Sequence, residues 1–220
     1  PPATLIPMRR AQRVVLCGDP CQLPPTVKSR GGSPLAETLL ERLMNDVPQH
    51  TCMLEVQHRM HPAIMAAGNA RFYDGRLKAH PSVLEATLEG LPPMLWVDTS
   101  GCGFEEKRSA EGGSVSNEDE ARFVLERAKD WLELHPNMTL GVVAPYAAQV
   151  ECLKNLWLER VRDGELPSGA RVTIHTVDGF QGQERDGMLV SLTRSNERGE
   201  VGFLSESRRI HVAQTRAKHA

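Results

Sequence analysis

The sequence lacks a charge excess of either sign. Its 220 residues include 26 lysines and arginines against 28 aspartates and glutamates, which gives a formal net charge of −2 at pH 7. This balance excludes a protein that attracts nucleic acid through a positive field over its whole surface, so any site for a polyanion must be local. No apolar run is long enough to span a membrane, and we therefore expect no membrane partner.

Cysteine is also sparse. The five cysteines form no Cys-x-x-Cys pair and are odd in number, which favours reduced thiols in a cytoplasmic or nuclear protein over a disulfide framework. The opening residues, Pro-Pro-Ala-Thr-Leu, contain no initiator methionine, basic leader or signal core, so we expect the chain to be cut from a longer polypeptide. What is present, 40% hydrophobic and 25% charged residues, is typical of a globular protein.

Apolar runs with strand character alternate along the chain with segments of helical spacing. Strands are predicted at residues 13–17, 95–97, 139–144, 172–175 and 188–193. Helices are predicted at residues 35–44, 62–73, 147–160 and 208–219, and from a capping box at Ser116 and Asp119 to residue 132. Between them, a linker is predicted at residues 45–52 and a mobile loop at 101–113. The alternation predicts an α/β fold whose mainly parallel sheet is flanked by helices.

Polar segments follow four of the predicted strands. They lie at residues 18–20, 145–146, 176–184 and 194–196. The carboxyl ends of parallel strands meet at one edge of a sheet, and open α/β sheets bind their ligands there. We therefore expect these segments to build a site together.

The first of these segments opens the stretch G-D-P-C-Q-L-P-P, in which prolines stiffen a turn that holds a carboxylate and an amide. Asp19 and Gln22 are the candidate residues. An amide can donate to a phosphate oxygen and accept from a water, as positioning glutamines do in phosphoryl transfer. An ordinary tight turn explains the same residues.

The stretch Q-H-R-M-H-P at residues 57–62 opens a predicted helix, and a helix N-terminus favours anions. Arg59 could clamp such an anion, with a surface ion pair as the alternative. His58 and His61 invite a metal site, but no Cys, Asp or further His stands at ligand spacing. We predict no metal site in this chain.

The stretch T-V-D-G-F-Q-G-Q-E at residues 176–184 contains two glycines, which permit the close approach of a ligand. Gly182 can present an N–H to a phosphate, and Glu184 can accept from a ribose hydroxyl. A plain turn has the same composition.

The last predicted helix carries Arg209 and Arg216 seven residues apart, which places them on one face. The guanidinium fork matches a phosphate better than an ammonium does, so Arg216 is the strongest candidate for a phosphate contact. A basic helix surface is the alternative.

Six motifs, taken in their order, resemble the second half of a superfamily 1 helicase. They are GDPCQLPP, QHRMHP, APYxxQ, VDGFQGQE, RSN and GFLSESRRIHVAQTRAK. The chain resembles the subfamily that includes the nonsense-mediated decay helicase and the immunoglobulin mu-binding helicase. The resemblance runs from about residue 5 to residue 220 and is weakest at 76–135. Each motif alone is weak evidence, whereas six in order are specific.

The resemblance implies an ATP-dependent helicase with two RecA-like domains, ATP between them and single-stranded DNA or RNA across their top. Residues 1–50 would end the first domain and residues 51–220 would form the second, in a protein that the family suggests is a monomer. To phosphoryl transfer the resemblance assigns Gln22, Arg59 and Arg216. To the nucleotide it assigns Asp19, Gln57, His58, Gly182 and Glu184. To the nucleic acid it assigns Pro145, Tyr146, Thr176 and Arg194.

The chain departs from the family pattern at single residues. His58 stands where a tyrosine usually stacks on adenine, His211 where asparagine is usual, and Lys218 where arginine is usual. These departures weaken the prediction of tight base binding more than that of phosphate contact.

Larger elements of the family pattern are missing. There is no G-x-x-x-x-G-K-[ST] loop, and no Asp-Glu pair stands where Mg²⁺ would be held. The family carries both upstream, so we expect the 220 residues alone not to hydrolyse ATP. A non-catalytic nucleic-acid-binding module and a regulatory domain that binds a partner remain as alternatives. The choice between DNA and RNA depends on contacts to the 2′-hydroxyl, which no motif here fixes.

Overall fold

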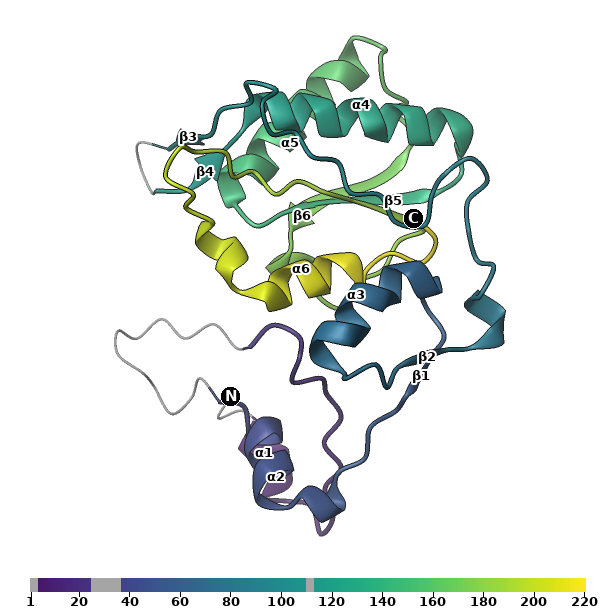
Figure 1. The fold of residues 1–220 in the computed structure, drawn as a ribbon, viewed down its shortest axis with the longest axis vertical. Coiled ribbons are helices and arrows are strands. Elements are labelled where there is room, and N and C mark those ends of the chain that lie inside the picture. Colours follow the sequence, from purple (N-terminus) through teal and green to yellow (C-terminus); the bar gives the residue numbers. More distant parts are fainter. Residues whose placement is uncertain (1–3, 25–36, 110–112) are drawn as a thin grey trace. The chain divides into compact units, whose positions relative to one another are not determined.

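The computed structural model describes residues 4–24, 37–109 and 113–220 (Figure 1). Contacts within the chain divide it into two compact units, Pro1–Leu54 and Glu55–Ala220. This division lies close to the boundary predicted at residue 50. The assignment of the two units to two RecA-like domains stays a prediction.

The first unit contains the helices α1 (Leu5–Met8) and α2 (Leu39–Asp46) and the 3₁₀ turn η2 (Pro48–His50). A capping box starts α2: the Thr38 hydroxyl accepts from the N–H of Glu41 at 3.1 Å, and the Glu41 carboxylate accepts from the N–H of Thr38 at 2.7 Å. These bonds satisfy donors that the first helical turn leaves exposed. The predicted helix at 35–44 is confirmed from residue 39, while residues 35 and 36 lie outside the described residues.

The strand predicted at residues 13–17 is wrong. These residues have no regular structure, and Val15 is 86% exposed. An apolar run becomes a strand only when a neighbour pairs with its backbone N–H and C=O groups. The described part of the first unit contains no strand that could do so.

The second unit is built on a parallel sheet in which β5 (Thr139–Ala144) lies between β6 (Arg171–Thr176) and β7 (Gly187–Val190). Val142 of β5 pairs with Ile174 on one side and Leu189 on the other. Residues 140–144 are all buried, as expected for a central strand of a parallel sheet. The three strands predicted for this region are confirmed, although β7 ends at Val190 instead of residue 193.

Helices cover both faces of this sheet (Figure 1). On one face lie α4 (Glu118–Leu134) and α5 (Ala147–Arg162), and on the other α3 (Pro62–Phe72) and α6 (Ser207–Gln214). The predicted α/β fold with helices flanking a parallel sheet is therefore confirmed, and it is consistent with the RecA-like domain that the resemblance implies.

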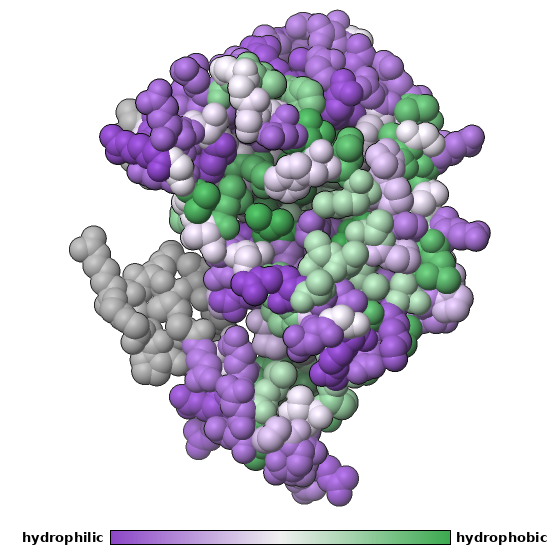
Figure 2. All heavy atoms as spheres, in the orientation of Figure 1, coloured by the Kyte–Doolittle hydropathy of each residue, from purple (hydrophilic) through white to green (hydrophobic). Residues whose placement is uncertain are grey.

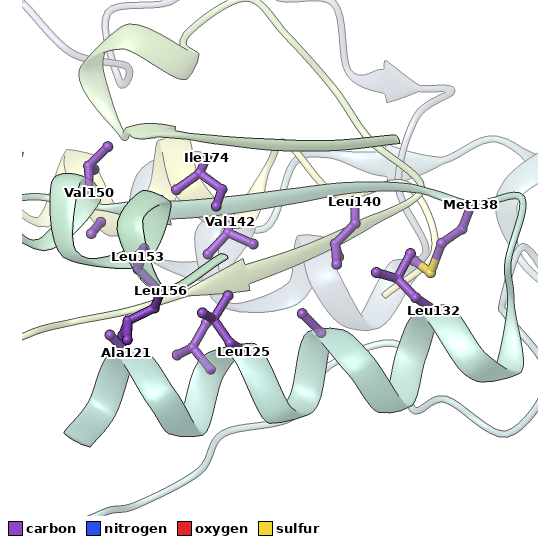
Figure 3. Close-up of a cluster of buried hydrophobic side chains, with 13 residues drawn as sticks. Ala121, Leu125, Leu132, Met138, Leu140, Val142, Val150, Leu153, Leu156 and Ile174 are labelled. Carbon is purple, nitrogen blue, oxygen red and sulfur yellow. The ribbon is translucent and has the colours of Figure 1, made fainter. Parts of the chain in front are cut away.

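The hydrophobic core lies between β5, α4 and α5 (Figure 3). Leu125 of α4, Leu140 of β5 and Leu153 of α5 are all fully buried. Burial of one such side chain contributes about 1.5–3 kcal/mol, so this cluster fixes both helices against the sheet. Hydrophilic residues gather on the outer side of these helices, at the top of Figure 2.

The start of α4 differs from the prediction by one residue. Asn117, not Ser116, is the N-cap, and its side chain accepts from the N–H of Glu120 at 3.0 Å. Ser116 instead ends the short strand β4 (Val115–Ser116), which pairs in antiparallel fashion with β3 (Lys107–Arg108). This pairing also places a strand in the segment predicted as a loop at 101–113.

A small parallel pair, β1 (Val56–Gln57) and β2 (Lys78–Ala79), brackets α3 and is followed by the 3₁₀ turn η3 (Pro81–Val83). The helix predicted from Pro62 is confirmed, and it ends at Phe72. The strand predicted at residues 95–97 is wrong: the segment has no regular structure, and its side chains are 46–64% exposed.

The helix predicted at residues 208–219 ends early. After Gln214 the chain turns and runs beside β7: the N–H of Lys218 donates to the carbonyl of Arg185 at 3.0 Å, and the N–H of Met188 donates to that of Ala220 at 2.8 Å. The unpaired edge of β7 supplies hydrogen-bond partners that outweigh helix propensity. Two 3₁₀ turns complete the unit, η4 (Asp178–Phe180) and η5 (Gly202–Ser205).

All five cysteines are free, as predicted. Among the described residues, no helix is both long enough and apolar enough to span a bilayer.

Candidate functional site

A cleft of about 680 Å³ opens on the second unit. It brings together four residues that the sequence predicts for a nucleotide site. The residues that line it are Gln57, His58, Arg59, Met60, Ser82, Val83, Ala86, Glu184, Lys218 and His219. They come from β1, the turn before α3, η3 and the residues after it, the segment before β7 and the C-terminal segment, so the fold assembles the cleft from distant parts of the sequence.

The charged centre of the cleft is Glu184, which lies between two cations. Its carboxylate accepts from Nε of Arg59 at 2.7 Å and lies 3.2 Å from Nζ of Lys218. The hydrogen bond from Arg59 is the main cause that lowers the pKa of Glu184 below its usual value, against the opposing effect of burial. Two cations against one carboxylate leave this part of the cleft net positive, which suits an anionic ligand.

The Arg59 guanidinium has a second anchor in the carbonyl of Thr215, at 3.1 Å from Nη1. This carbonyl lies at the end of α6, where helical carbonyls lack intrahelical partners and attract a cation. The Arg59 side chain remains 35% exposed. It is therefore held in one orientation and is still open to a ligand.

The Gln57 amide shapes the turn before α3. Its Oε1 accepts from the N–H groups of Arg59 and Met60, both at 2.9 Å, and its Nε2 donates to the carbonyl of Met60 at 2.7 Å. Since these bonds use both ends of the amide, Gln57 positions Arg59. Its predicted contact with a nucleotide stays a prediction.

The ring of His58 stacks on that of His80, with ring centroids 4.1 Å apart and planes at 30°. His80 begins η3, where its Nδ1 accepts from the N–H of Ser82 at 3.2 Å. His80 could not be found from the sequence, because its partner lies 22 positions earlier and none of the six motifs contains it.

Arg216 is 2% exposed and lies beside the cleft, not among its lining residues. Its Nε donates to the carbonyl of Val212 at 3.0 Å and its Nη2 to the hydroxyl of Thr215 at 2.9 Å. The guanidinium thus closes the C-terminal turn of α6. Arg209 and Arg216 do not share a helix face as predicted, because the helix ends between them.

Gly182 and Thr176 lie outside the cleft. Gly182 has φ = +85°, a conformation that favours glycine, and a Cβ there would meet no atom within 4 Å. The Thr176 hydroxyl accepts from the N–H of Gly179 at 3.2 Å and so shapes the turn after β6. The roles predicted for both residues stay predictions.

Asp19 and Gln22 belong to the first unit. Asp19 accepts from the N–H of Cys21 at 2.9 Å and from Nε2 of Gln22 at 3.0 Å, and the N–H of Gln22 donates to the carbonyl of Asp19 at 3.2 Å. The carboxylate and the amide are thus brought together, in a compact turn.

A second cluster lies near the carboxyl ends of β5 and β7. Nε and Nη2 of Arg194 donate to the two carboxylate oxygens of Glu106 at 2.7 and 3.1 Å, and both side chains are 8% exposed. The N–H of Ser195 donates to the same carboxylate at 3.0 Å. Burial would raise the pKa of Glu106, but these hydrogen bonds outweigh it, so the pKa lies below its usual value.

Arg194 also contacts a predicted nucleic-acid residue. Its Nη1 donates to the hydroxyl of Tyr146 at 3.2 Å. Tyr146 is 4% exposed, and Pro145 is buried too. The fold thus brings Tyr146 and Arg194 together as predicted, but with little of either side chain open to solvent.

A buried polar network fixes the segment that leads to Arg194. Gln149 of the A-P-Y-x-x-Q motif accepts from the N–H of Asn117 at 2.7 Å and donates to the hydroxyl of Ser191 at 3.0 Å. That hydroxyl donates to Glu120 at 3.1 Å, and burial raises the pKa of Glu120 despite this bond. The sequence analysis missed Glu120 because an acidic residue is ordinary in the first turn of a helix.

Comparisons with known proteins place the chain in a family. A family model described as an AAA domain matches residues 35–220, and a second AAA-domain model matches residues 1–30. The chain belongs to this family. Its relatives confirm the resemblance to superfamily 1 helicases of the nonsense-mediated decay subfamily.

Three relatives illustrate the likeness. The chain is 38% identical to the DNA-binding protein SMUBP-2 of Mesocricetus auratus, over 97% of its own length and 22% of that protein. It is 36% identical to DNA polymerase alpha-associated DNA helicase A of Saccharomyces cerevisiae, over 94% of the chain and 33% of that protein. It is 34% identical to the regulator of nonsense transcripts 1 homolog of Arabidopsis thaliana, over 99% of the chain and 18% of that protein. The chain therefore spans a third or less of these relatives.

Proposed function

We propose that this chain is the C-terminal part of the motor of an ATP-dependent helicase. The motor would couple ATP hydrolysis to movement along a single strand of DNA or RNA and to unwinding. The observation that carries the proposal is the meeting of Gln57, His58, Arg59 and Glu184 in one cleft. Membership of a family with relatives named as helicases, one of them as an ATP-dependent helicase of Methanocaldococcus jannaschii, supports it.

The residues of the cleft fit the polyphosphate of ATP. The volume of about 680 Å³ is within the range of ligand pockets, and Arg59 and Lys218 supply its positive charge. ATP would supply the phosphoryl group that is transferred. Arg59, oriented by Glu184 and by the carbonyl of Thr215, would stabilise the negative charge that grows on this group, an effect of about 10³–10⁵ in rate.

The chain does not fit Mg²⁺ equally well. Within the described ranges, no group of three or more His, Cys, Asp or Glu side chains could hold a metal ion. We therefore assign the ligands of Mg²⁺ to the other half of the motor.

The remaining nucleotide residues have narrower proposed roles. His58, supported from behind by His80, would stack on adenine in place of the family's tyrosine. Gly182 would offer its N–H to a phosphate. Arg216 would act with Arg59, because the two are joined through Thr215, which accepts from both.

Asp19 and Gln22 would act on the attacking water. The Asp19 carboxylate holds the Gln22 side chain by a bond of 3.0 Å, which limits where that amide can point. Such orientation of an amide is what a water-positioning glutamine requires.

The nucleic acid would cross the carboxyl ends of the strands, along the segments that contain Pro145, Tyr146, Thr176 and Arg194. Because the Arg194 guanidinium is engaged by Glu106 and Tyr146, we propose that it holds these segments in place. This proposal replaces the direct role at the nucleic acid that the resemblance implies for Arg194.

A binding assay with the full-length protein tests the motor proposal. We expect its affinity for a short single-stranded oligonucleotide to change by about 5- to 150-fold when a non-hydrolysable ATP analogue is added, as is typical of coupled sites. DNA and RNA strands of one sequence, measured side by side, identify the substrate. The 220 residues alone should show no ATP turnover.

Binding that ignores the analogue and falls steeply with salt would contradict the motor proposal. Such behaviour is that of a module that contacts only phosphates. Steady ATP turnover by the 220 residues alone would contradict the requirement for a second half.

A further inference from the structure

Two aromatic rings stack near the carboxyl end of β5, and only one of them faces solvent. Tyr146 follows β5 and is 4% exposed, whereas Phe203 of η5 is 55% exposed. Their ring centroids lie 5.1 Å apart with planes at 25°. The motif points to Tyr146, but a ligand that approaches this pair meets Phe203 first.

The pair is held together by its backbone and not by ring contact alone. The hydroxyl of Tyr146 accepts from the N–H of Phe203 at 3.0 Å and from Nη1 of Arg194 at 3.2 Å. Gly202, at φ = +55°, lets the chain come this close, since a Cβ there would collide with both the Tyr146 hydroxyl and Arg194 Nη1. Ring stacking, the hydrogen bond from its own N–H and the close approach at Gly202 therefore fix the position of Phe203.

A cation lies against the exposed ring. The guanidinium of Arg209 is 5.1 Å from the centroid of Phe203, and its Nη1 donates to the Phe203 carbonyl at 3.1 Å. Its Nε lies 3.3 Å from Asp178, which limits its motion further. An exposed ring with a guanidinium beside it, at the edge of the sheet where ligands bind, has the composition of a stacking platform for bases.

We propose that Phe203 stacks on an unpaired base of a single-stranded nucleic acid, with Tyr146 as its rigid support and Arg209 beside it. The inference rests on the proposed function, because it names the base contact of the same nucleic-acid surface. A single large exposed side chain costs little free energy in water. Because Phe203 is already held against a buried partner, little side-chain entropy is lost when it stacks on a base. Every base has a π face, so the contact tolerates any sequence.

The test compares Phe203→Ala with Phe203→Tyr in the full-length protein. The probes are a single-stranded oligonucleotide and an abasic strand of the same length, so that phosphate contacts are present in both. We expect Phe203→Ala to weaken binding of the base-bearing strand by about 5- to 150-fold. The salt dependence of this binding and the affinity for the abasic strand should stay as in the wild type. Phe203→Tyr should bind as the wild type does.

Val201→Ala is the matched control, because Val201 is 53% exposed and lies two residues from Phe203. It should leave the affinity for both strands unchanged. A third variant, Phe203→Trp, reports the contact directly: stacking should quench the added tryptophan fluorescence when the base-bearing strand binds and leave it unchanged with the abasic strand.

Three results would overturn the proposal. Phe203→Ala could bind the base-bearing strand as tightly as the wild type, or it could lose affinity for both strands equally, or the Phe203→Trp fluorescence could ignore the bases. If the wild type still binds the base-bearing strand in any of these cases, the proposed function is retained. A wild type that binds neither strand overturns the proposed function together with this inference.

Discussion

Arg59 and Arg194 were both assigned to a ligand by their motifs, yet their guanidinium groups are used differently. Arg59 is 35% exposed and reaches Glu184 at the wall of the cleft. Arg194 is 8% exposed, and its nitrogens bond to Glu106 and Tyr146. Exposure separates a guanidinium that is open to solvent from one that is engaged within the protein, and the amino-acid type alone does not reveal it.

Removal of Glu106 leaves the buried Arg194 guanidinium with only the partly exposed Glu200, 3.6 Å from its Nη2, as an acidic partner, and removal of Arg194 leaves the Glu106 carboxylate buried without a cation. We therefore expect Glu106→Ala to lower the free energy of unfolding by about 3–5 kcal/mol. Arg194→Met should cost a similar amount, and the double variant should cost less than the sum, because the two side chains share one interaction. Urea denaturation of the four proteins measures these values.

Glu133→Ala is the control for this series, since Glu133 forms only an exposed pair with Lys129 at 4.0 Å. Its free energy of unfolding should stay within about 0.5 kcal/mol of the wild type. A cost for Glu106→Ala no larger than that of the control would show that the buried pair does not hold this region together.

At the scale of elements, periodicity predicted the helices and strands that pack into the core, and it failed for apolar runs that have no packing partner. The strands β5, β6 and β7 and the helices α4 and α5 follow apolar runs or helical spacings that are buried in one continuous core. The runs at 13–17 and 95–97 have similar composition but remain exposed, because a strand also needs a partner. The sequence likewise predicts α6 but not its end, since the edge of β7 competes for residues 216–220.

Gly141 tests the packing of the central strand. It lies in β5, and a Cβ there would collide with Met188 of β7 and come within 2.9 Å of the fully buried ring of Phe180. We expect Gly141→Ala to lower the free energy of unfolding by about 1–3 kcal/mol, the cost of overpacking a core.

Gly169→Ala provides the matched comparison for this prediction, because a Cβ at Gly169 would meet nothing within 4 Å. Chemical denaturation should place this variant within about 0.5 kcal/mol of the wild type. Equal free energies of unfolding for the two glycine variants would contradict the prediction, because they would mean that the side chains around β5 shift to accommodate the added methyl group.

At the scale of the whole molecule, the order of motifs predicted the residues of the cleft better than any single motif could. Gln57, His58, Arg59 and Glu184 come together because two motifs, more than 100 positions apart, meet where Arg59 pairs with Glu184. His80 and Glu106 could not be predicted in this way, and the sixth motif contains Phe203 without indicating its contact with Tyr146. Each of the three contacts a partner far away in the sequence, and the fold alone brings these partners together.

The central claim is that Arg59 acts on the transferred phosphoryl group of ATP, and the ATPase kcat of the full-length protein tests it most directly. We expect Arg59→Ala to lower kcat by at least about 10³-fold. Arg59→Lys should recover only part of this loss, because an ammonium lacks the planar fork. Arg76→Ala, which removes an exposed arginine paired with Glu55, should turn over ATP as the wild type does. A kcat for Arg59→Ala equal to that of Arg76→Ala would contradict the claim.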